Sequence, residues 1–393
     1  MIAQSSMHIA LPTALLGGLS PQQFMRRHWQ KKPCLIRAAV AEAGAVVDRA
    51  GLFALAARAD VESRLVVHDT DRWALRHGPF PRRSLPALKR PAWTLLVQGA
   101  DLHLEAAHRL LRRFRFVPDA RLDDVMFSFA TDGGGVGPHL DSYDVFLLQI
   151  RGRRRWRIGK PRAPCLRDDV PLKMLAGFAP SDEWLLEPGD MLYLPPGWAH
   201  DGVAEGETIT ASIGFRTENA QTLGIELAQR LLDDVEAAVR ESRYADRDQA
   251  ATATPARIPD GLQRFADAAL TRLFADARAR ARSLGEALSE PKPGVAFERA
   301  DLAAGGSGVR LDRRTRMLYD ERHVFINGEA FRAGGRDAVA VRRLADRREL
   351  SARGVAAMSA EGRAQVAAWI EAGWLRSGFV ETGVGTAGSH EQS

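Results

Sequence analysis

The stretch DGGGVGPHLD at residues 132–141 places a histidine and an aspartate two positions apart, directly after a predicted strand. On an extended segment the side chains at positions i and i+2 point to the same face. His139 and Asp141 are therefore expected to point into one cavity. A histidine and a carboxylate that share a cavity are candidate metal ligands.

A second histidine completes this pattern further along the chain. His200 ends the stretch EPGDMLYLPPGWAH at residues 187–200, in which two Pro-Gly turns enclose a short predicted strand. Two histidines and one carboxylate on neighbouring strands form the facial triad of non-haem Fe(II) oxygenases. That triad leaves room for a bidentate 2-oxo acid and for dioxygen. We therefore expect His139, Asp141 and His200 to bind Fe(II).

The sequence around these motifs predicts a jelly-roll. Apolar residues alternate or run continuously in short segments separated by Gly, Pro and Asp, which is typical of a β-sandwich or barrel. Six such strands are expected, at residues 125–131, 145–150, 155–158, 183–186, 191–194 and 208–215. Helical patterns are nearly absent from about residue 92 to residue 216. We expect this stretch to form the catalytic core.

The regions on either side of this core have a different hydrophobic pattern. Before about residue 90, short helical patterns at 21–25 and 51–55 alternate with apolar runs. After residue 217 the apolar residues recur with helical period, which predicts helices at 223–239 and 262–274. The segment 290–294 is expected to be a linker. The dipeptide Asn327-Gly328 is a strong hairpin signal.

These patterns predict a mainly β protein with added helices, in three parts. The predicted parts are an oxygenase domain at 1–216 with its jelly-roll core at about 92–216, a helical region at 217–290, and a winged-helix-like domain at 291–393. The last part is suggested by the hairpin and a helix at 364–372. The tail at 383–393 is expected to be disordered.

Composition limits the protein class. The chain has 393 residues, of which 45% are hydrophobic and 26% charged, and these values exclude a disordered or collagenous protein. Cys34 and Cys165 are the only cysteines, so neither a disulfide scaffold nor a cysteine zinc site can form. No run of eighteen apolar residues is present. We expect a cytoplasmic protein without a membrane-spanning segment.

The net charge of +6 is unevenly distributed. Residues 1–120 contain 18 Lys/Arg and 9 Asp/Glu, a net charge of +9. Residues 121–220 contain 11 and 15, a net charge of −4, and residues 221–393 contain 26 and 25, a net charge of +1. The predicted catalytic region is thus acidic, and the segment before it is basic.

An enzyme that uses 2-oxoglutarate also needs a cation for the distal carboxylate, and a bidentate arginine suits this group. The stretch GRRRWR at 152–157 offers four arginines on a predicted strand. If Trp156 is buried, Arg154 shares its inward face. Ser128 and Ser212, each on a strand expected to line the barrel, are further candidates for contacting the cosubstrate.

The glycine and proline spacing around His139 and His200 also resembles the cupin signature. That signature has a second histidine where Asp141 stands and a glutamate a few residues later. This chain has Val145 and Phe146 in the region of that glutamate. These departures favour a 2-oxoglutarate oxygenase over a cupin isomerase.

Four stretches together resemble the bacterial JmjC ribosomal oxygenases of the YcfD (RoxA) type. They are HWQKKP at 28–33, DGGGVGPHLDSYDVF at 132–146, GRRRW at 152–156 and PPGWAH at 195–200. The resemblance extends from about residue 10 to residue 216 and continues with less specific similarity into the C-terminal part. It implies that the triad binds Fe(II) and that Arg154 holds 2-oxoglutarate, with dioxygen as the second cosubstrate.

The resemblance also implies a substrate and an assembly. Bacterial members of the family hydroxylate an arginine on a large-subunit ribosomal protein, form homodimers through a helical region and carry a winged-helix domain. Here that helical region would be at about 217–285. Asp132 is the first candidate for holding the substrate guanidinium, followed by Tyr143 and Asp144. Alternatively, Asp132 satisfies backbone donors of the glycine turn.

Charge supports this substrate class. The acidic region at 121–220 suits a cationic peptide, and the basic N-terminal part suggests a contact with ribosomal RNA.

Two other functions remain open at the level of sequence. The same iron chemistry serves a JmjC histidine hydroxylase or an N-methyl demethylase acting on another protein. A third hypothesis is a winged-helix regulator that binds nucleic acid and carries a metal-sensing barrel. It is motivated by the arginine pairs at 342–343 and 347–348, which Asp346 and Glu349 interrupt.

Overall fold

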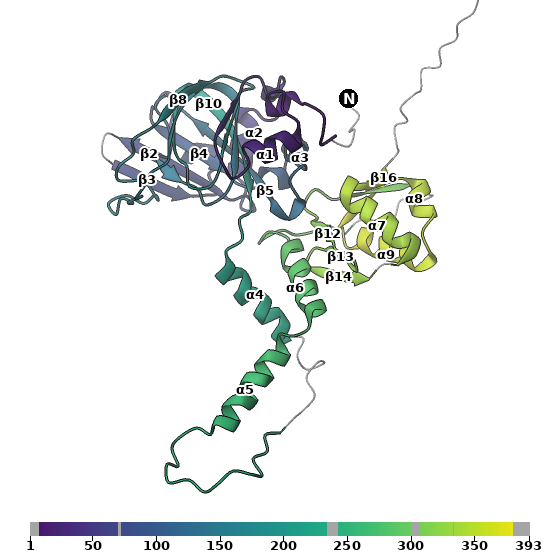
Figure 1. Cartoon of the computed structure of the whole chain (residues 1–393). Coiled ribbons are helices and arrows are strands. Elements are labelled where there is room, and N and C mark those ends of the chain that lie inside the picture. The colour runs from purple at the N-terminus through teal and green to yellow at the C-terminus, as the bar shows by residue number, and fades with distance from the viewer. Residues whose placement is uncertain (1–7, 70–71, 234–242, 300–306, 333, 380–393) are drawn as a thin grey trace, which may run out of the picture. The chain divides into compact units, whose positions relative to one another are not determined.

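The computed structural model describes residues 8–69, 72–233, 243–299, 307–332 and 334–379, so the tail at 383–393 lies outside the described residues. The chain divides into two compact units, Met1–Thr217 and Glu218–Ser393 (Figure 1). Each unit has a hydrophobic core of its own. Among the described residues, no helix combines the length and the apolar composition that crossing a bilayer requires.

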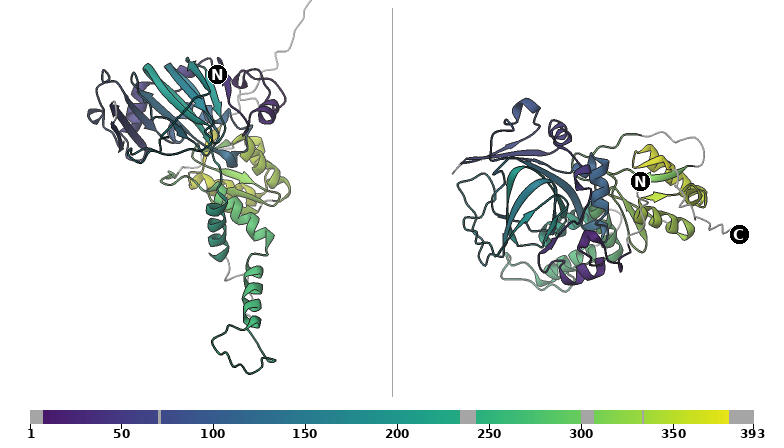
Figure 2. Two further views of the ribbon diagram at one scale, coloured as in Figure 1. Left: turned by 60° about the vertical axis from the view of Figure 1, so that its left-hand side comes forward. Right: turned by 90° about the horizontal axis from the view of Figure 1, so that it is seen from above.

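The first unit is built on one antiparallel sheet whose strand order is β1-β9-β7-β10-β5-β4-β2-β3, with β6 paired to β10 and β8 to β7. Seen from above, the strands curve around a common interior (Figure 2). The strands are β1 Cys34–Ile36, β2 Ser63–Asp69, β3 Arg72–His77, β4 Trp93–Val97, β5 Leu122–Ala130, β6 His139–Leu140, β7 Val145–Gly159, β8 Asp182–Leu186, β9 Met191–Leu194 and β10 Ala199–Phe215. The predicted jelly-roll class is thus confirmed.

Three helices accompany this sheet. They are α1 Pro21–Arg27, α2 Arg49–Ala56 and α3 Glu105–Arg112, and short 3-10 turns occupy Ala14–Leu16, Ala43–Ala45, Arg82–Ser84, Ala100–Leu102 and Asp119–Arg121. Ser20 and Gln23 form a capping box at the start of α1, and the Asp48 carboxylate accepts from the Gly51 amide at the start of α2. These caps fix where the N-terminal helices begin.

Two observed strands are longer than the sequence patterns predicted. The runs at 145–150 and 155–158 are both part of β7, and β10 extends from the histidine turn to the end of the unit. Gly152 allows β7 to continue because its φ of 67° lies in the left-handed region that favours glycine. A Cβ at this position would also lie only 2.1 Å from the Glu207 carbonyl oxygen. The register between β7 and β10 shifts at this point, between Glu205 and Ile209.

The sequence patterns did not predict β2, β3, β4 or α3. Helix α3 buries Ala107, Leu110 and Leu111 on one face and exposes charged residues on the other, so it does carry a helical period. Its eight residues are too few for that period to stand out beside the surrounding strand patterns.

An aromatic cluster ties the N-terminal helices to the sheet. Phe24 on α1 lies 5.4 Å from Phe146 on β7 and 5.0 Å from Tyr193 on β9, measured between ring centroids. Phe114 lies 4.8 Å from Phe146 in the same cluster. Because segments so distant in sequence share one core, the N-terminal residues form part of the same unit as the barrel.

The second unit contains α4 Ala220–Asp233, α5 Asp260–Leu273 and α6 Ala277–Ser289, followed by a small mixed module. Helix α6 packs against the module, since a Cβ on Gly285 would lie only 2.2 Å from the Phe325 ring. Helix α6 also contacts α4, one of the helices with which the sequence pattern grouped it. Helical periodicity shows that a helix has an apolar face but does not show what covers that face.

The module contains two three-stranded sheets, β15-β11-β16 and β12-β13-β14, with three helices. Asn327 and Gly328 have positive φ and connect β13 to β14, as a two-residue hairpin requires. The elements of the module are β11 Gly308–Leu311, β12 Met317–Tyr319, β13 His323–Ile326, β14 Glu329–Arg332, α7 Gly335–Arg347, β15 Glu349–Leu350, α8 Ala352–Ala356, α9 Ala360–Glu371 and β16 Leu375–Phe379.

Candidate metal centre and cosubstrate pocket

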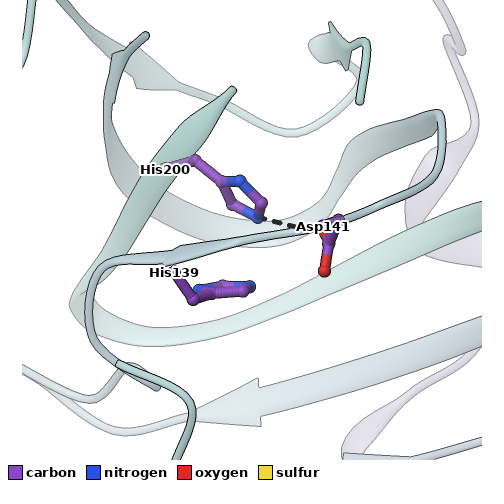
Figure 3. Close-up of side chains that lie close together, drawn as sticks. All are labelled: His139, Asp141 and His200. Carbon is purple, nitrogen blue, oxygen red and sulfur yellow. Dashed lines mark ion pairs between the residues drawn. The ribbon is translucent and has the colours of Figure 1, made fainter. Parts of the chain in front are cut away.

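Strand pairing brings the three predicted metal ligands together. β6 pairs with β10 so that His139 lies opposite His200, and Asp141 follows β6 directly. One ligand atom from each of the three side chains lies within 4.8 Å of the others. The His200 Nε2 atom is 3.5 Å from Asp141 Oδ2, and both imidazoles lie beside this carboxylate (Figure 3).

Backbone carbonyl groups fix the tautomer of both histidines. His139 Nδ1 donates to the Gly137 carbonyl oxygen at 2.9 Å, and His200 Nδ1 donates to the Trp198 carbonyl oxygen at 3.2 Å. Because Nδ1 carries the proton in each ring, the lone pair is on Nε2. Both rings are thus oriented as metal ligands usually are, with the second nitrogen held by an outer partner.

The electrostatics of the site favour a cation. Burial lowers the pKa of His200 well below its usual value, and the neighbouring His139 and Arg154 lower it further, so this imidazole is neutral and able to coordinate. Burial raises the pKa of the Asp141 carboxyl, although His139 partly opposes that rise. A divalent ion would compensate the buried carboxylate. Two imidazoles and one carboxylate suit non-haem Fe(II).

Arg154 lies on β7 in the barrel interior with 3% of its surface exposed. Nη1 donates to Ser128 Oγ at 2.9 Å, and Nη2 donates to the Gly202 carbonyl oxygen at 3.1 Å. Its charged centre lies 5.0 Å from the ring centroid of Trp156, which is also buried. The placement matches the expectation that Arg154 points inward on the face of Trp156.

The charge of Arg154 is incompletely compensated. Its Nε atom is buried and has no hydrogen-bond partner among the described residues. Burial lowers the pKa of the Arg154 guanidinium to about 10, although the Asp201 carboxylate partly opposes this. A buried cation that lacks a full set of partners is costly and favours an anionic ligand. The distal carboxylate of 2-oxoglutarate has the charge and geometry to complete this site.

A row of polar side chains crosses three strands beside Arg154. Ser128 on β5, Thr210 on β10 and Gln149 on β7 lie opposite one another in the register of the sheet. The Thr210 hydroxyl donates to Gln149 Oε1 at 2.9 Å. Because its proton is directed to Gln149, the Thr210 oxygen can accept from Arg154 Nη1, which lies 3.5 Å away. Gln149 itself is held by its amide donating to Thr208 Oγ1 at 2.9 Å.

This row changes the choice of hydroxyl residues. Ser128, which was expected to contact the cosubstrate, accepts a hydrogen bond from Arg154, whereas on β10 the hydroxyl beside the guanidinium is that of Thr210. Ser212 lies opposite Met126 and Leu147, two residues further along the strand. Thr210 and Ser212 lie on the same face of one strand, so the sequence alone does not show which of them meets Arg154 until the register across the sheet is known.

Gly202 makes room for this pocket. A Cβ at this position of β10 would lie 2.6 Å from the Trp156 ring and 2.8 Å from Arg154 Nε. The arginine and the tryptophan can pack across the strand only because the side chain is absent.

The three candidate substrate residues differ in availability. Asp132 is exposed, and its Oδ1 accepts from the Gly206 amide at 2.8 Å. This carboxylate oxygen therefore binds the backbone of β10 and not the backbone of the glycine turn. Tyr143 is 38% exposed, and its phenol hydrogen-bonds to Asp141. Burial and the Asp141 charge raise its pKa, so the phenol stays protonated.

Asp144 is fully buried and serves the fold. Its carboxylate accepts from the Tyr193 hydroxyl at 2.6 Å and from the Gln30 side-chain amide at 3.1 Å, and Arg121 lies 3.5 Å away. With both oxygens engaged in the core, this carboxylate is unavailable to a substrate. Sequence proximity to Asp141 gave no sign of this, because Tyr193 and Gln30 come from distant segments.

Family models match both units of the chain. A JmjC domain model matches residues 109–223, and a ROXA-like winged helix model matches residues 272–376. The second match begins before α6, in agreement with the packing of that helix against the module.

Similarity to individual proteins is concentrated in one family. The chain is 39% identical to the ribosomal protein uL16 3-hydroxylase of Escherichia coli over 238 residues, covering 60% of this chain and 62% of that protein. The matched segment thus spans less than two thirds of that relative.

Solved structures of Escherichia coli YcfD match over a greater length. One has a TM-score of 0.82 at 30% identity and covers 91% of this chain and 98% of the other. A complex of the ribosomal oxygenase YcfD with cobalt and 2-oxoglutarate has a TM-score of 0.79 at 31% identity, with the same coverage. This chain therefore belongs to the JmjC-domain ribosomal oxygenases of the YcfD type.

Proposed function

We propose that this protein is an Fe(II)- and 2-oxoglutarate-dependent dioxygenase that hydroxylates an arginine side chain of a large-subunit ribosomal protein. The observation that carries the proposal is the pairing of the His139, Asp141 and His200 cluster with a buried, incompletely partnered Arg154 in the same barrel interior. A metal site and an anion site so placed suit a bidentate 2-oxo acid with a second carboxylate.

The residues have distinct roles in this proposal. His139, Asp141 and His200 would hold the metal, and Arg154 with Ser128 and Thr210 would hold the distal carboxylate of 2-oxoglutarate. Bound Fe(II), with 2-oxoglutarate and dioxygen, supplies the oxidising power for hydroxylating an unactivated C–H bond while yielding succinate and carbon dioxide. The protein chain positions the target carbon and excludes stray reductants.

Asp132 is the residue that we assign to the substrate. Its Oδ2 atom accepts no hydrogen bond from the described residues, and it lies on an exposed side chain at the glycine turn that leads to His139. A guanidinium that donates to this oxygen would gain a charge-assisted bond. The arginine target is supported by this carboxylate and by the acidic balance of residues 121–220, and the ribosomal substrate by the name of the uL16 3-hydroxylase relative.

We expect Asp132→Asn to raise the KM for a ribosomal-protein peptide by about tenfold or more, because a charge-assisted bond becomes a neutral one. The KM for 2-oxoglutarate should stay unchanged. Steady-state kinetics with each ligand varied in turn measures both constants. Asp123→Asn, a substitution at a half-buried carboxylate of β5 that lies 3.5 Å from Arg216, is the control. An unchanged peptide KM would exclude Asp132 as the guanidinium partner.

Mass spectrometry of the reacted peptide separates the proposed reaction from its alternatives. Gain of one oxygen atom on an arginine supports the proposal, gain on a histidine indicates a histidine hydroxylase, and loss of a methylene indicates an N-methyl demethylase. The regulator hypothesis gains little from the structure, because Arg348 is buried and donates to the Asp312 and Thr315 carbonyl oxygens.

The same proposal describes a cytoplasmic homodimer that forms through α4 and α5. Apolar side chains on these helices are exposed in the single chain, among them Leu232 at 52% and Leu270 at 58%. Large apolar residues exposed on the surface of helices are typical of a protein interface.

Leu270→Glu is therefore expected to dissociate the dimer. Sedimentation equilibrium should give twice the chain mass of 43.1 kDa for the parent protein and a single chain mass for the variant. Gln263→Glu adds a charge to the same helix at an exposed polar position and should leave the dimer intact. A monomeric parent protein at micromolar concentration would contradict the assembly.

A further inference from the structure

Six cations follow one another along the segment from β3 to β4. They are Arg72, Arg76, Arg82, Arg83, Lys89 and Arg90, and no Asp or Glu lies between residues 72 and 92. All six side chains are exposed. We call this set the basic rim. It accounts for a third of the 18 Lys/Arg in residues 1–120, so it is a main source of the basic charge of that region.

The fold holds the basic rim at an open edge of the sheet. β3 is the terminal strand of the sheet and pairs only with β2 among the described strands (Figure 1). The charged group of Arg76 lies 5.6 Å from the Phe80 ring centroid, and that of Arg82 lies 5.2 Å from the Phe53 ring centroid. These aromatic contacts anchor the two side chains by their faces and leave their N–H groups available.

The basic rim has no acidic partner among the residues that the structure describes. Within the described part of the chain, no carboxylate lies within ion-pair distance of any of the six residues. Other arginines of the same unit are paired, for example Arg115 with Asp119 at 2.6 Å and Arg155 with Glu183 at 2.7 Å. Unlike those paired arginines, this segment stays cationic, and a polyanion would be attracted to it.

The basic rim ends beside the candidate substrate carboxylate. The Ala92 amide donates to the Asp132 carbonyl oxygen at 2.8 Å, only two residues after Arg90. His68 Nε2, on the strand paired with β3, donates to the Gly133 carbonyl oxygen at 3.0 Å. The cationic segment thus borders the turn that carries Asp132. Asp132, which could bind a cationic side chain, and the basic rim, which could bind an anion, therefore belong to neighbouring segments.

From this arrangement we infer that the basic rim binds the phosphate backbone of structured RNA while Asp132 engages a cationic protein side chain attached to that RNA. Exposed Arg and Lys side chains without acidic partners are the groups that contact phosphates, independently of base sequence. A basic protein segment bound to RNA presents both charges in close proximity, which is the pattern that this face complements. Naming that RNA as ribosomal RNA rests on the proposed function, whereas RNA binding by the basic rim does not.

The test uses the full-length protein and a fluorescein-labelled double-stranded RNA hairpin in anisotropy titrations at several salt concentrations. The variant Arg83→Gln/Lys89→Gln/Arg90→Gln removes three cations that make no aromatic contact. We expect its affinity to fall at least about tenfold, and the slope of log K against log salt to decrease by about two to three, roughly one per lost phosphate contact. The variant Lys160→Gln/Arg162→Gln/Lys173→Gln removes three exposed cations from another loop and should bind like the parent protein.

Turnover of a free ribosomal-protein peptide, measured as succinate, should be equal in the parent protein and both variants. Turnover of the same protein bound to its RNA fragment should show a raised KM only in the basic-rim variant. Equal RNA affinity in all three proteins, or an equal loss in both variants, would overturn the inference.

If polyglutamate competed as effectively as unlabelled RNA, the surface would be assigned to an acidic protein instead. Absence of peptide turnover in the parent protein would count against the proposed function and leave the RNA result independent.

Discussion

Replacing His139 with alanine is expected to abolish hydroxylation and 2-oxoglutarate turnover together. The substitution removes one of the three groups that converge within 4.8 Å, and the remaining pair, Asp141 and His200, cannot form a facial triad. Loss of even an outer partner of a metal ligand costs about 10- to 100-fold in affinity or activity. Loss of a metal ligand itself should therefore lower the activity by more than about a hundredfold. Succinate formation with a ribosomal-protein peptide measures the activity.

Metal binding provides the independent readout. The parent protein should bind one Mn(II) per chain in anaerobic titrations, and the His139→Ala variant should bind it at least about a hundredfold more weakly. His323→Ala is the matched control, because His323 lies in the second unit beside Asp320 and has no part in the proposed site. Thermal unfolding of the metal-free proteins checks that both variants are folded. Full succinate formation by the His139→Ala variant would contradict the assignment of the metal centre.

Replacing Arg154 with methionine is expected to raise the KM for 2-oxoglutarate by about a hundredfold. The guanidinium would make two charge-assisted hydrogen bonds to the distal carboxylate, each worth about 1.5 kcal/mol or more. Methionine fills similar space without the buried charge, so folding should be preserved. Arg154→Lys keeps the charge but loses the bidentate geometry and should fall between the parent protein and the methionine variant. Steady-state kinetics with 2-oxoglutarate as the varied ligand gives these constants.

The polar row beside Arg154 supplies a graded pair of variants for the same measurement. Thr210→Val removes the hydroxyl that lies 3.5 Å from Arg154 and should raise the KM for 2-oxoglutarate by several-fold, about the value of one neutral hydrogen bond. Ser212→Ala, at the next residue on the same strand face, should leave the constant unchanged. Equal effects of the two changes would show that the row does not orient the arginine. An unchanged KM in the Arg154→Met variant would exclude Arg154 as the carboxylate ligand.

Local patterns were sufficient for the main features of this protein. The i and i+2 spacing of His139 and Asp141, the Pro-Gly turns before His200 and the inward face shared by Arg154 and Trp156 all follow from strand geometry within a few residues. The jelly-roll class followed from the strand pattern and is confirmed by the observed sheet. Cosubstrate chemistry followed from the types of residues in the triad, because two imidazoles and one carboxylate favour non-haem iron.

Features that depend on distant partners were decided by the tertiary structure. Thr210 rather than Ser212 approaches Arg154 because the register among β5, β10 and β7 places Thr210 beside it. Asp144 is buried because Tyr193 and Gln30, from other segments, bind its carboxylate. A strand pattern shows which side chains share a face, whereas register and long-range packing determine which of them meet, and those depend on contacts between segments far apart in the chain.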